Sequence, residues 1–163
     1  MPKCVSKELP ASLFDRLSGR DVDRYLEHVI LLYTVDGNGY AHPSILSYFE
    51  VAAKDPSNLR LATYSDSKTT ENMKSRGKVT LSIFDKRLAY SIKGTVREIR
   101  RGMRAVARNS ISYVAVDQVL VDEADPVLEP GAYIAAGINC VNPNIGTERT
   151  WRNEVLNELL ESL

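Results

Sequence analysis

A group of hydroxyl side chains and one lysine follows the clearest strand pattern near the middle of the chain. The hydroxyls belong to Thr63, Ser65, Ser67 and Thr69, and the cation is Lys68. A strand that runs into the first turn of a helix leaves backbone amides without intrahelical acceptors. Amides, hydroxyls and a cation are together the groups that bind a phosphate. These residues therefore predict a phosphate seat, although a plain capped connection between strand and helix accounts for the same pattern.

The elements that position this group can be read from its flanks. Residues 59–64 alternate in polarity, which predicts a strand. Ser65-Asp66-Ser67 suits the start of a helix, because short polar side chains cap free amides. The helix is predicted to continue over 70–75 and to end at Arg76-Gly77-Lys78. The predicted seat thus lies at the junction of a strand and a helix.

Three short motifs in this stretch resemble the FMN-phosphate segment of the pyridoxamine 5'-phosphate oxidase-like, flavin-binding split-barrel proteins. In chain order, the motifs are Ala62-Thr63, Ser67-Lys68-Thr69 and Asn72-Met73. Two flanking segments resemble the same family, namely Tyr33–Pro43 and Tyr90–Glu98. The order and spacing of these segments together carry the resemblance.

The resemblance implies a fold, a cofactor and an assembly. The fold would be mainly β (α+β), an antiparallel split β-barrel of six to seven strands with short flanking helices. FMN would lie at the subunit interface of a homodimer, in an FMN-dependent oxidoreductase that acts on a small-molecule substrate. The strand around residues 44–47 would meet the polar edge of the flavin ring. The residues implied to contact FMN are Ser44, Ile45, Leu46, Ala62, Thr63, Ser67, Lys68, Thr69 and Asn72.

The sequence departs from the oxidases of this family in two places. A glutamine that many of them carry on the strand after the motif has no counterpart, since Ala89 or Tyr90 stands there. The basic and aromatic residues that they use on their substrate have no clear match either, and Trp151 and Arg152 are the nearest candidates. Trp151 lies on an apolar helical face, where a core or interface position accounts for it. The sequence therefore assigns neither that oxidase activity nor a catalytic residue.

Two other functions fit the same barrel. One is a non-catalytic flavin- or haem-binding module, a carrier or a sensor, and some relatives bind a deazaflavin. Haem would need an axial ligand, for which His28, His42, the cysteines, methionines and tyrosines are candidates. His42 could instead donate a proton beside the ring, or simply face solvent at a strand end. The other function is that of a barrel that binds no cofactor and acts in assembly.

Composition is that of an ordinary globular protein. The 163 residues fit one domain, 1–163, and a formal net charge of zero gives no reason to expect nucleic acid or a membrane surface as a partner. Cys4 and Cys140 are too few and too far apart for a disulfide framework or a zinc site, so no metal is predicted. The sequence shows no signal peptide and no apolar stretch near the roughly 20 residues that span a bilayer. A cytoplasmic protein is expected.

The rest of the chain predicts strands joined by tight turns. Short helical segments are expected over 9–17 and 21–25, and a longer one from Thr147. Strands are expected at 28–35, 40–53, 79–84, 88–100, 111–121 and 132–141. Asp36–Gly39 is the clearest hairpin signal. Pro43 indicates an edge, a bulge or a strand start, and Gly94 indicates a bulge or a barrel corner. Cys140, on the last predicted strand, is expected to be buried.

Overall fold

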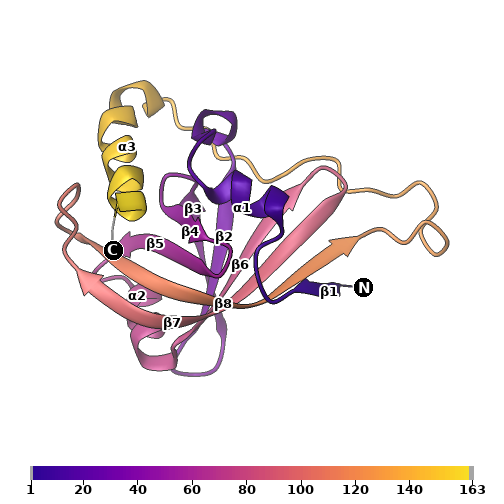
Figure 1. The fold of residues 1–163 in the computed structure, drawn as a ribbon, viewed down its shortest axis with the longest axis horizontal. Helices are drawn as coiled ribbons and strands as arrows, with labels where there is room; N and C mark the ends of the chain where they lie inside the picture. The colour runs from indigo at the N-terminus through magenta and orange to yellow at the C-terminus, as the bar shows by residue number, and fades with distance from the viewer. Residues whose placement is uncertain (1, 162–163) are drawn as a thin grey trace.

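The computed structural model describes residues 2–161 as one curved antiparallel sheet with helices at its margins (Figure 1). The strands are hydrogen-bonded in the order β3-β2-β6-β7-β8-β5-β4, and β1 pairs with β8. Because β3 and β4 end this order without pairing with each other, the barrel is split. The mainly β, split-barrel fold is therefore confirmed. The strands are β1 (Lys3–Ser6), β2 (Val29–Val35), β3 (Ala41–Ser47), β4 (Val51–Asp55), β5 (Asn58–Tyr64), β6 (Lys78–Asp85), β7 (Leu88–Arg101) and β8 (Asn109–Glu123).

The helices lie where the sequence predicts them. Leu13 and Leu17 on the first helix are buried, as their spacing requires. On the C-terminal helix the apolar face is buried, but Trp151 at its edge is 37% exposed. The helical segments are α1 (Ala11–Leu17), the 3-10 helix η1 (Val22–Tyr25), α2 (Lys68–Arg76) and α3 (Ile145–Glu161).

A hairpin joins β2 to β3, and β3 is an edge strand because β2 is its one neighbour in the described sheet. Asp36 accepts hydrogen bonds from the amides of Tyr40 and Asn38 at 2.9 and 2.8 Å. The bond from Tyr40 is the main cause that lowers the pKa of the Asp36 carboxyl. Gly39 has a φ of 88°, which favours glycine. Pro43 lies within β3, which pairs only with β2 in the described sheet, and an edge strand tolerates its missing N–H.

A tight turn separates β3 from β4, so the single strand predicted over 40–53 is wrong. The Glu50 carboxylate accepts hydrogen bonds from the amide and the hydroxyl of Ser47 at 2.7 and 2.8 Å. The Glu50 amide donates in turn to the Ser47 carbonyl at 3.0 Å. The turn contains neither glycine nor proline, and its aromatic side chains are buried. This division, together with β1, raises the sheet to eight described strands rather than six to seven.

Gly94 of β7 marks an irregularity in the pairing of the long strands β7 and β8. The register between them shifts between Lys93 and Gly94. A Cβ atom on Gly94 would lie 2.5 Å from Val114 Cγ1 and 2.9 Å from the Ala115 carbonyl oxygen. The shift in register agrees with the first of the two predictions for Gly94, a bulge or a barrel corner, and the close approach of β8 explains why this position is a glycine.

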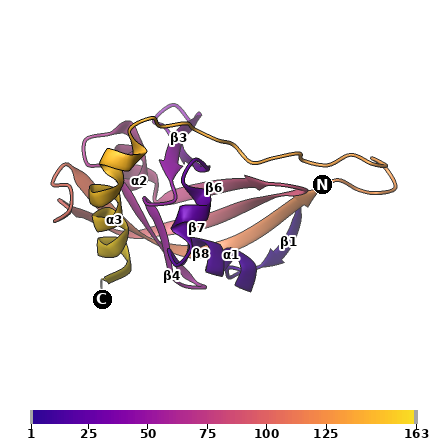
Figure 2. The same ribbon diagram turned by 90° about the horizontal axis from the view of Figure 1, so that it is seen from above.

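Residues 124–144, which we call the strap, form an exposed connection. Figures 1 and 2 show the strap leaving the end of β8, projecting beyond the sheet and returning to the start of α3. It touches the sheet through isolated bonds, such as that from the Val29 amide to the Ile138 carbonyl at 3.0 Å. β6 pairs with β2 only from Leu31 to Tyr33, and beside the start of β2 the strap forms one isolated bridge, between Asn139 and His28, instead of a ladder. The strand predicted over 132–141 is therefore wrong, and Cys140 is exposed rather than buried.

Two apolar clusters lie on opposite faces of β5. Leu59 and Leu61 belong to the larger cluster, which also contains the buried side of α1 and much of β2 and β6. Ala62 belongs to the smaller cluster, beneath α3. This division follows from the alternation of side chains along a strand. Because β5 is buried on both faces, the position of its end, where the predicted seat begins, is fixed.

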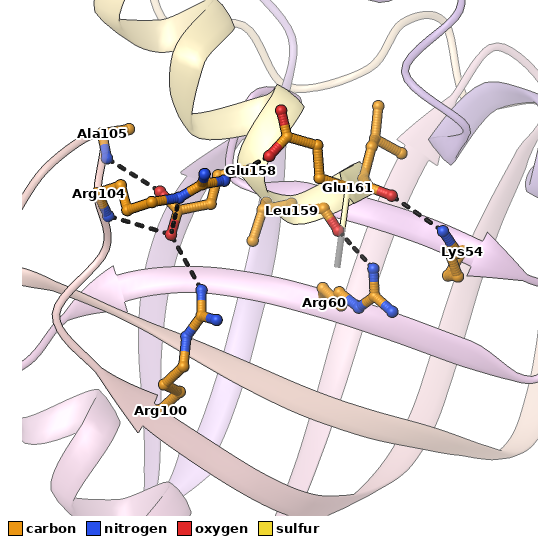
Figure 3. Close-up of polar contacts among 9 residues, drawn as sticks. Lys54, Arg60, Arg100, Arg104, Ala105, Glu158, Leu159 and Glu161 are labelled. Carbon is orange, nitrogen blue, oxygen red and sulfur yellow. Dashed lines mark hydrogen bonds and ion pairs between the residues drawn. The ribbon is translucent and has the colours of Figure 1, made fainter. Parts of the chain in front are cut away.

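A buried carboxylate attaches α3 to the loop after β7 (Figure 3). The Glu158 side chain is 4% exposed and accepts hydrogen bonds from the amides of Arg104 and Ala105 at 3.0 and 2.9 Å. Arg100 donates a further bond to it at 3.0 Å. A buried carboxylate with this many donors is satisfied, and its partners keep the helix in one position.

Cations also hold the C-terminal end of α3 on the sheet. Arg60, which is 6% exposed, donates to the Leu159 carbonyl at 2.7 Å, and Lys54 donates to the Leu160 carbonyl at 3.0 Å (Figure 3). The last carbonyls of a helix have no intrahelical donors and carry partial negative charge. These two cations therefore stabilise the C-terminal end of the helix.

Candidate functional site

The first turn of α2 has the capping geometry that the sequence predicts. The Ser67 hydroxyl accepts a hydrogen bond from the Thr70 amide at 3.2 Å. The Ser67 carbonyl accepts one from the Glu71 amide at 3.0 Å. The other first-turn amides, those of Lys68 and Thr69, are the donors that a helix start leaves to solvent or to an anion.

A hydrogen bond joins this helix start to the edge strand β3. The hydroxyls of Ser44 and Thr69 bond to each other across a separation of 25 residues in the chain. The family resemblance implies that residues 44–47 on β3 meet the ring of a flavin and that the start of α2 holds its phosphate. The fold therefore brings the two halves of the sequence-predicted site together.

Several of the predicted site residues lie inside the protein. The hydroxyls of Thr63 and Thr70 bond to each other at 2.7 Å, and the Asn72 amide group donates to the Thr34 hydroxyl at 3.0 Å. These buried polar groups satisfy one another and fix the orientation of α2 against the barrel. The buried members of the predicted set are Leu46, Ala62, Thr63, Thr69 and Asn72, each exposed by 6% or less.

Four of the predicted residues reach the surface, namely Ser44, Ile45, Ser67 and Lys68. Ile45 is 63% exposed, and the Lys68 side chain is 51% exposed. Ser44 and Ser67 are half-buried. The accessible groups are thus a cation and hydroxyls beside α2, and an apolar side chain on β3.

Charge around the start of α2 is mixed. Lys68 Nζ lies 3.0 Å from a Glu71 carboxylate oxygen, and an Arg101 nitrogen lies 2.8 Å from one on Asp66. Exposed pairs of this kind are weak and exchange partners readily. A cavity of about 280 Å³ beside the cap is lined by Ser65, Asp66, Ser67, Glu71 and Lys74. A phosphate bound at Lys68 would compete with Glu71 for its charge.

Sequence reasoning missed the residues of β8 and its preceding loop that brace this corner. The Ser65 and Ser110 hydroxyls bond to each other at 2.8 Å across a separation of 45 residues. The Ser65 amide donates to the Arg108 carbonyl at 2.8 Å, and the Arg108 guanidinium lies 5.0 Å from the centre of the Tyr64 ring. Only the pairing of β5 with β8 creates these contacts, so no local pattern in the sequence signals them.

The other candidates named from the sequence are dispersed. His42 is a half-buried residue of β3. His28 packs edge-on against Tyr25 with ring centroids 5.8 Å apart, and its buried Nδ1 has no hydrogen-bond partner within residues 2–161. Trp151 lies beside Arg152, whose guanidinium is 5.0 Å from its ring. None of these contacts joins the start of α2.

Searches for two other kinds of site in the described residues gave negative results. No group of three or more His, Cys, Asp or Glu side chains there is arranged to hold a metal ion. None of the described helices combines the length and apolar character needed to cross a bilayer.

Comparison with known proteins gives a family match and structural likeness. The family model described as pyridoxamine 5'-phosphate oxidase matches residues 25–124. An FMN-binding protein from Syntrophomonas wolfei subsp. wolfei superposes with a TM-score of 0.53 at 12% identity, over 68% of this chain and 88% of that one. HupZ from Group A Streptococcus superposes with a TM-score of 0.53 at 15% identity, over 82% and 99% of the two chains. At these identities the superpositions show likeness of fold. No curated protein matches the sequence significantly.

Proposed function

Because the chain belongs to the pyridoxamine 5'-phosphate oxidase family, we propose that it is a flavin-dependent oxidoreductase with FMN as its cofactor. The observation that carries the proposal is the hydrogen bond between Ser44 and Thr69. This bond sets a capped helix start beside an open strand edge, which are the two surfaces that a phosphorylated ring compound needs. The family match spans both elements, since it covers residues 25–124.

The start of α2 is the proposed seat of the FMN phosphate. Lys68 supplies a positive charge, Ser67 supplies a hydroxyl, and the amides of Lys68 and Thr69 supply aligned donors. Lys68 would exchange its contact with Glu71 for the phosphate, which carries more charge. Thr63 and Asn72 would act indirectly, by holding the helix in position through their buried bonds.

The outer edge of β3 is the proposed seat of the flavin ring. An edge strand presents N–H and C=O groups without partners, and these match the polar edge of the ring. Pro43 removes one donor from that edge. Ile45, at 63% exposed, offers an apolar contact for the body of the ring. The residues of the site therefore fit both the charged and the apolar part of FMN.

A second copy of the chain is proposed to cover the FMN bound between the start of α2 and the edge of β3. Three large side chains are exposed, namely Tyr40 just before β3, Ile45 on β3 and Tyr64 at the end of β5, by 72%, 63% and 57%. Contiguous exposed apolar surface marks a binding site, and a second copy packed along β3 would cover these side chains. Sedimentation of the FMN-loaded protein should give a dimer of the 18.2 kDa chain. A loaded monomer would contradict this part of the proposal.

Bound FMN would supply the redox chemistry, through hydride or single-electron transfer. The residues of this chain would bind the phosphate, orient the ring on β3 and exclude water with the second copy. The reaction named for the family is not proposed, because Ala89 and Tyr90 stand where its oxidases carry a glutamine. The proposed substrate is a small molecule of another kind.

The absorbance spectrum of the purified protein, with and without added FMN, tests the proposal. We expect the bands of an oxidised flavin, shifted by binding, and their bleaching by a chemical reductant. A Soret band would point to a haem-binding module instead. A colourless protein that leaves the spectrum and fluorescence of added FMN unchanged would contradict any flavin function.

A further inference from the structure

A cavity of about 310 Å³ lies next to the proposed ring strand and outside the phosphate seat. Ile45 of β3 forms part of its wall, and Val29, Val141 and Ile145 contribute further apolar surface. Its volume is at the lower end of the range for small-molecule sites, roughly 300–1,000 Å³. A ring bound along β3 at Ile45 would therefore adjoin this cavity.

One side of the cavity comes from a part of the chain beyond the family match. Residues 25–124 provide β2 and β3, whereas 140–152 provide the opposite side. The strap is held there by the bond from the Cys140 amide to the Glu27 carbonyl at 2.7 Å. A substrate site bounded by this segment would differ from one relative to the next, as specificity requires.

A polar network gives this second side a defined shape. The Glu148 carboxylate accepts hydrogen bonds from Arg152 Nε and Nη2 at 3.0 and 2.8 Å, and from the Asn142 amide group at 2.8 Å. The bonds from Arg152, followed by that from Asn142, lower the pKa of the Glu148 carboxyl. The network joins the end of the strap to α3, so the cavity wall is built before any ligand arrives.

The wall has no surplus of positive charge. With His28 counted as neutral, Glu50 and Arg152 are the charged side chains of the described wall, and their charges cancel. Arg152 is already paired with Glu148, which is not part of the cavity wall. An anion transferred into such a cavity would lose its hydration without gaining a free cation. The cavity is therefore unsuited to a phosphorylated or carboxylated substrate.

We propose that this cavity binds the substrate, and that the substrate is an uncharged small molecule with an apolar body and a hydrogen-bonding oxygen. The apolar side chains would hold the body, and Arg152 or Cys140 at the wall would donate to the oxygen. The identification of this ligand as the substrate rests on the proposed flavin function. The charge argument also accounts for the missing oxidase residues, since the substrate of those enzymes carries a phosphate.

A matched pair of probes tests the chemistry of the cavity. 1-Naphthol and 1-naphthyl phosphate share one apolar body and differ in charge. Isothermal titration of the FMN-treated protein should show 1-naphthol binding about tenfold or more tightly than 1-naphthyl phosphate. Equal binding of the two, preference for the phosphate, or no binding of 1-naphthol would overturn the proposal.

Substitutions at Val141 locate the binding. Val141→Trp should fill the cavity and weaken 1-naphthol binding about tenfold, and Val141→Lys should reduce the preference for the uncharged probe. Val127→Trp and Val127→Lys are the controls, because Val127 is an exposed strap residue outside the cavity wall. If the Val141 and Val127 variants behave alike, the probe binds elsewhere and the proposal fails.

Measuring FMN affinity in the same proteins separates the two proposals. We expect the Val141 variants to bind FMN as the wild type does, because Val141 lies outside the phosphate seat. Binding of 1-naphthol without any binding of FMN would uphold the cavity and overturn the flavin function. Binding of FMN without any binding of 1-naphthol would do the reverse.

Discussion

Lys68 contacts Glu71 in this structure and would contact the FMN phosphate in the loaded protein. A carboxylate carries one charge, whereas a phosphate monoester carries nearly two and offers three acceptor oxygens. Because the pair with Glu71 is exposed, little free energy is lost when Lys68 leaves it. Lys68 is therefore the side chain whose removal should affect FMN binding most directly.

The substitution Lys68→Ala should weaken FMN binding by about 1.5–3 kcal/mol, the scale of a hydrogen bond to a charged group. Quenching of FMN fluorescence during titration measures the dissociation constant. Lys86→Ala, at an exposed lysine in the turn between β6 and β7, is the control and should leave it unchanged. Wild-type affinity in the Lys68 variant would remove Lys68 from the site.

The substitution Glu71→Gln should strengthen FMN binding. It removes the carboxylate that competes with the phosphate for Lys68, and it lessens repulsion near the helix start. The expected gain is about 0.3–1 kcal/mol at low ionic strength, and it should shrink as salt is added. The same titration at two salt concentrations measures both effects. Weaker binding in this variant would mean that Glu71 supports the site rather than competing for it.

Different elements of the fold contribute different parts of the proposed site. In the proposed site, β5 and α2 would form the phosphate seat and β3 would offer the strand edge, whereas the strap and α3 supply one side of the second cavity. The smaller apolar cluster and Glu158 attach α3 to the sheet. The stability of that attachment therefore decides whether Arg152 and its network remain in place beside β3.

The substitution Glu158→Gln should destabilise the protein by about 1–3 kcal/mol. The two carboxylate oxygens of Glu158 accept amides from Arg104 and Ala105, and a glutamine would place its own N–H groups against one of these donors. Urea unfolding followed by circular dichroism measures the change. Glu154→Gln, at an exposed position of the same helix, should change stability by less than about 0.5 kcal/mol. Equal stabilities of the two variants would contradict the anchoring role of Glu158.

The sequence predicts the elements that carry local signals and fails where the signal is tertiary. Gly94, Pro43 and the Ser67 cap each force a backbone feature, and each was found where predicted. The turn before β4 depends on hydrogen bonds from Ser47 to the Glu50 carboxylate. The segment contains no glycine or proline that would predict a turn there. The strap reads as a strand from its apolar residues, but it pairs with the sheet only through an isolated bridge between Asn139 and His28, which no local pattern reveals.

The candidate site was predicted in the same uneven way. The motif residues come together at one corner, because strand β5 and helix α2 are continuous in the chain there. Which of these residues are exposed and which are buried depends on tertiary packing, and the spacing of the residues in the sequence does not reveal it. Asn72 illustrates this, since its amide group reaches Thr34 on β2 rather than the surface. The bracing by Ser110 and Arg108 depends on pairing between β5 and β8.

At the scale of the whole molecule, the start of α2 and the cavity beyond Ile45 are two places with different chemistry. The start of α2 has hydroxyls, free amides and a cation, whereas the cavity beyond Ile45 is apolar and has no net charge. A phosphorylated cofactor suits the first place and an uncharged substrate suits the second. Formal net charge is zero, so long-range attraction would not draw either ligand, and binding depends on these local groups.

Comparison of FMN with riboflavin tests the central claim most directly, because the two differ only in the phosphate. Titration of the cofactor-free protein with each compound, followed by flavin fluorescence, gives both dissociation constants. We predict that FMN binds at least about tenfold more tightly than riboflavin, and that Lys68→Ala removes most of this difference. Equal affinity for the two compounds in the wild-type protein would contradict a phosphate seat at the start of α2.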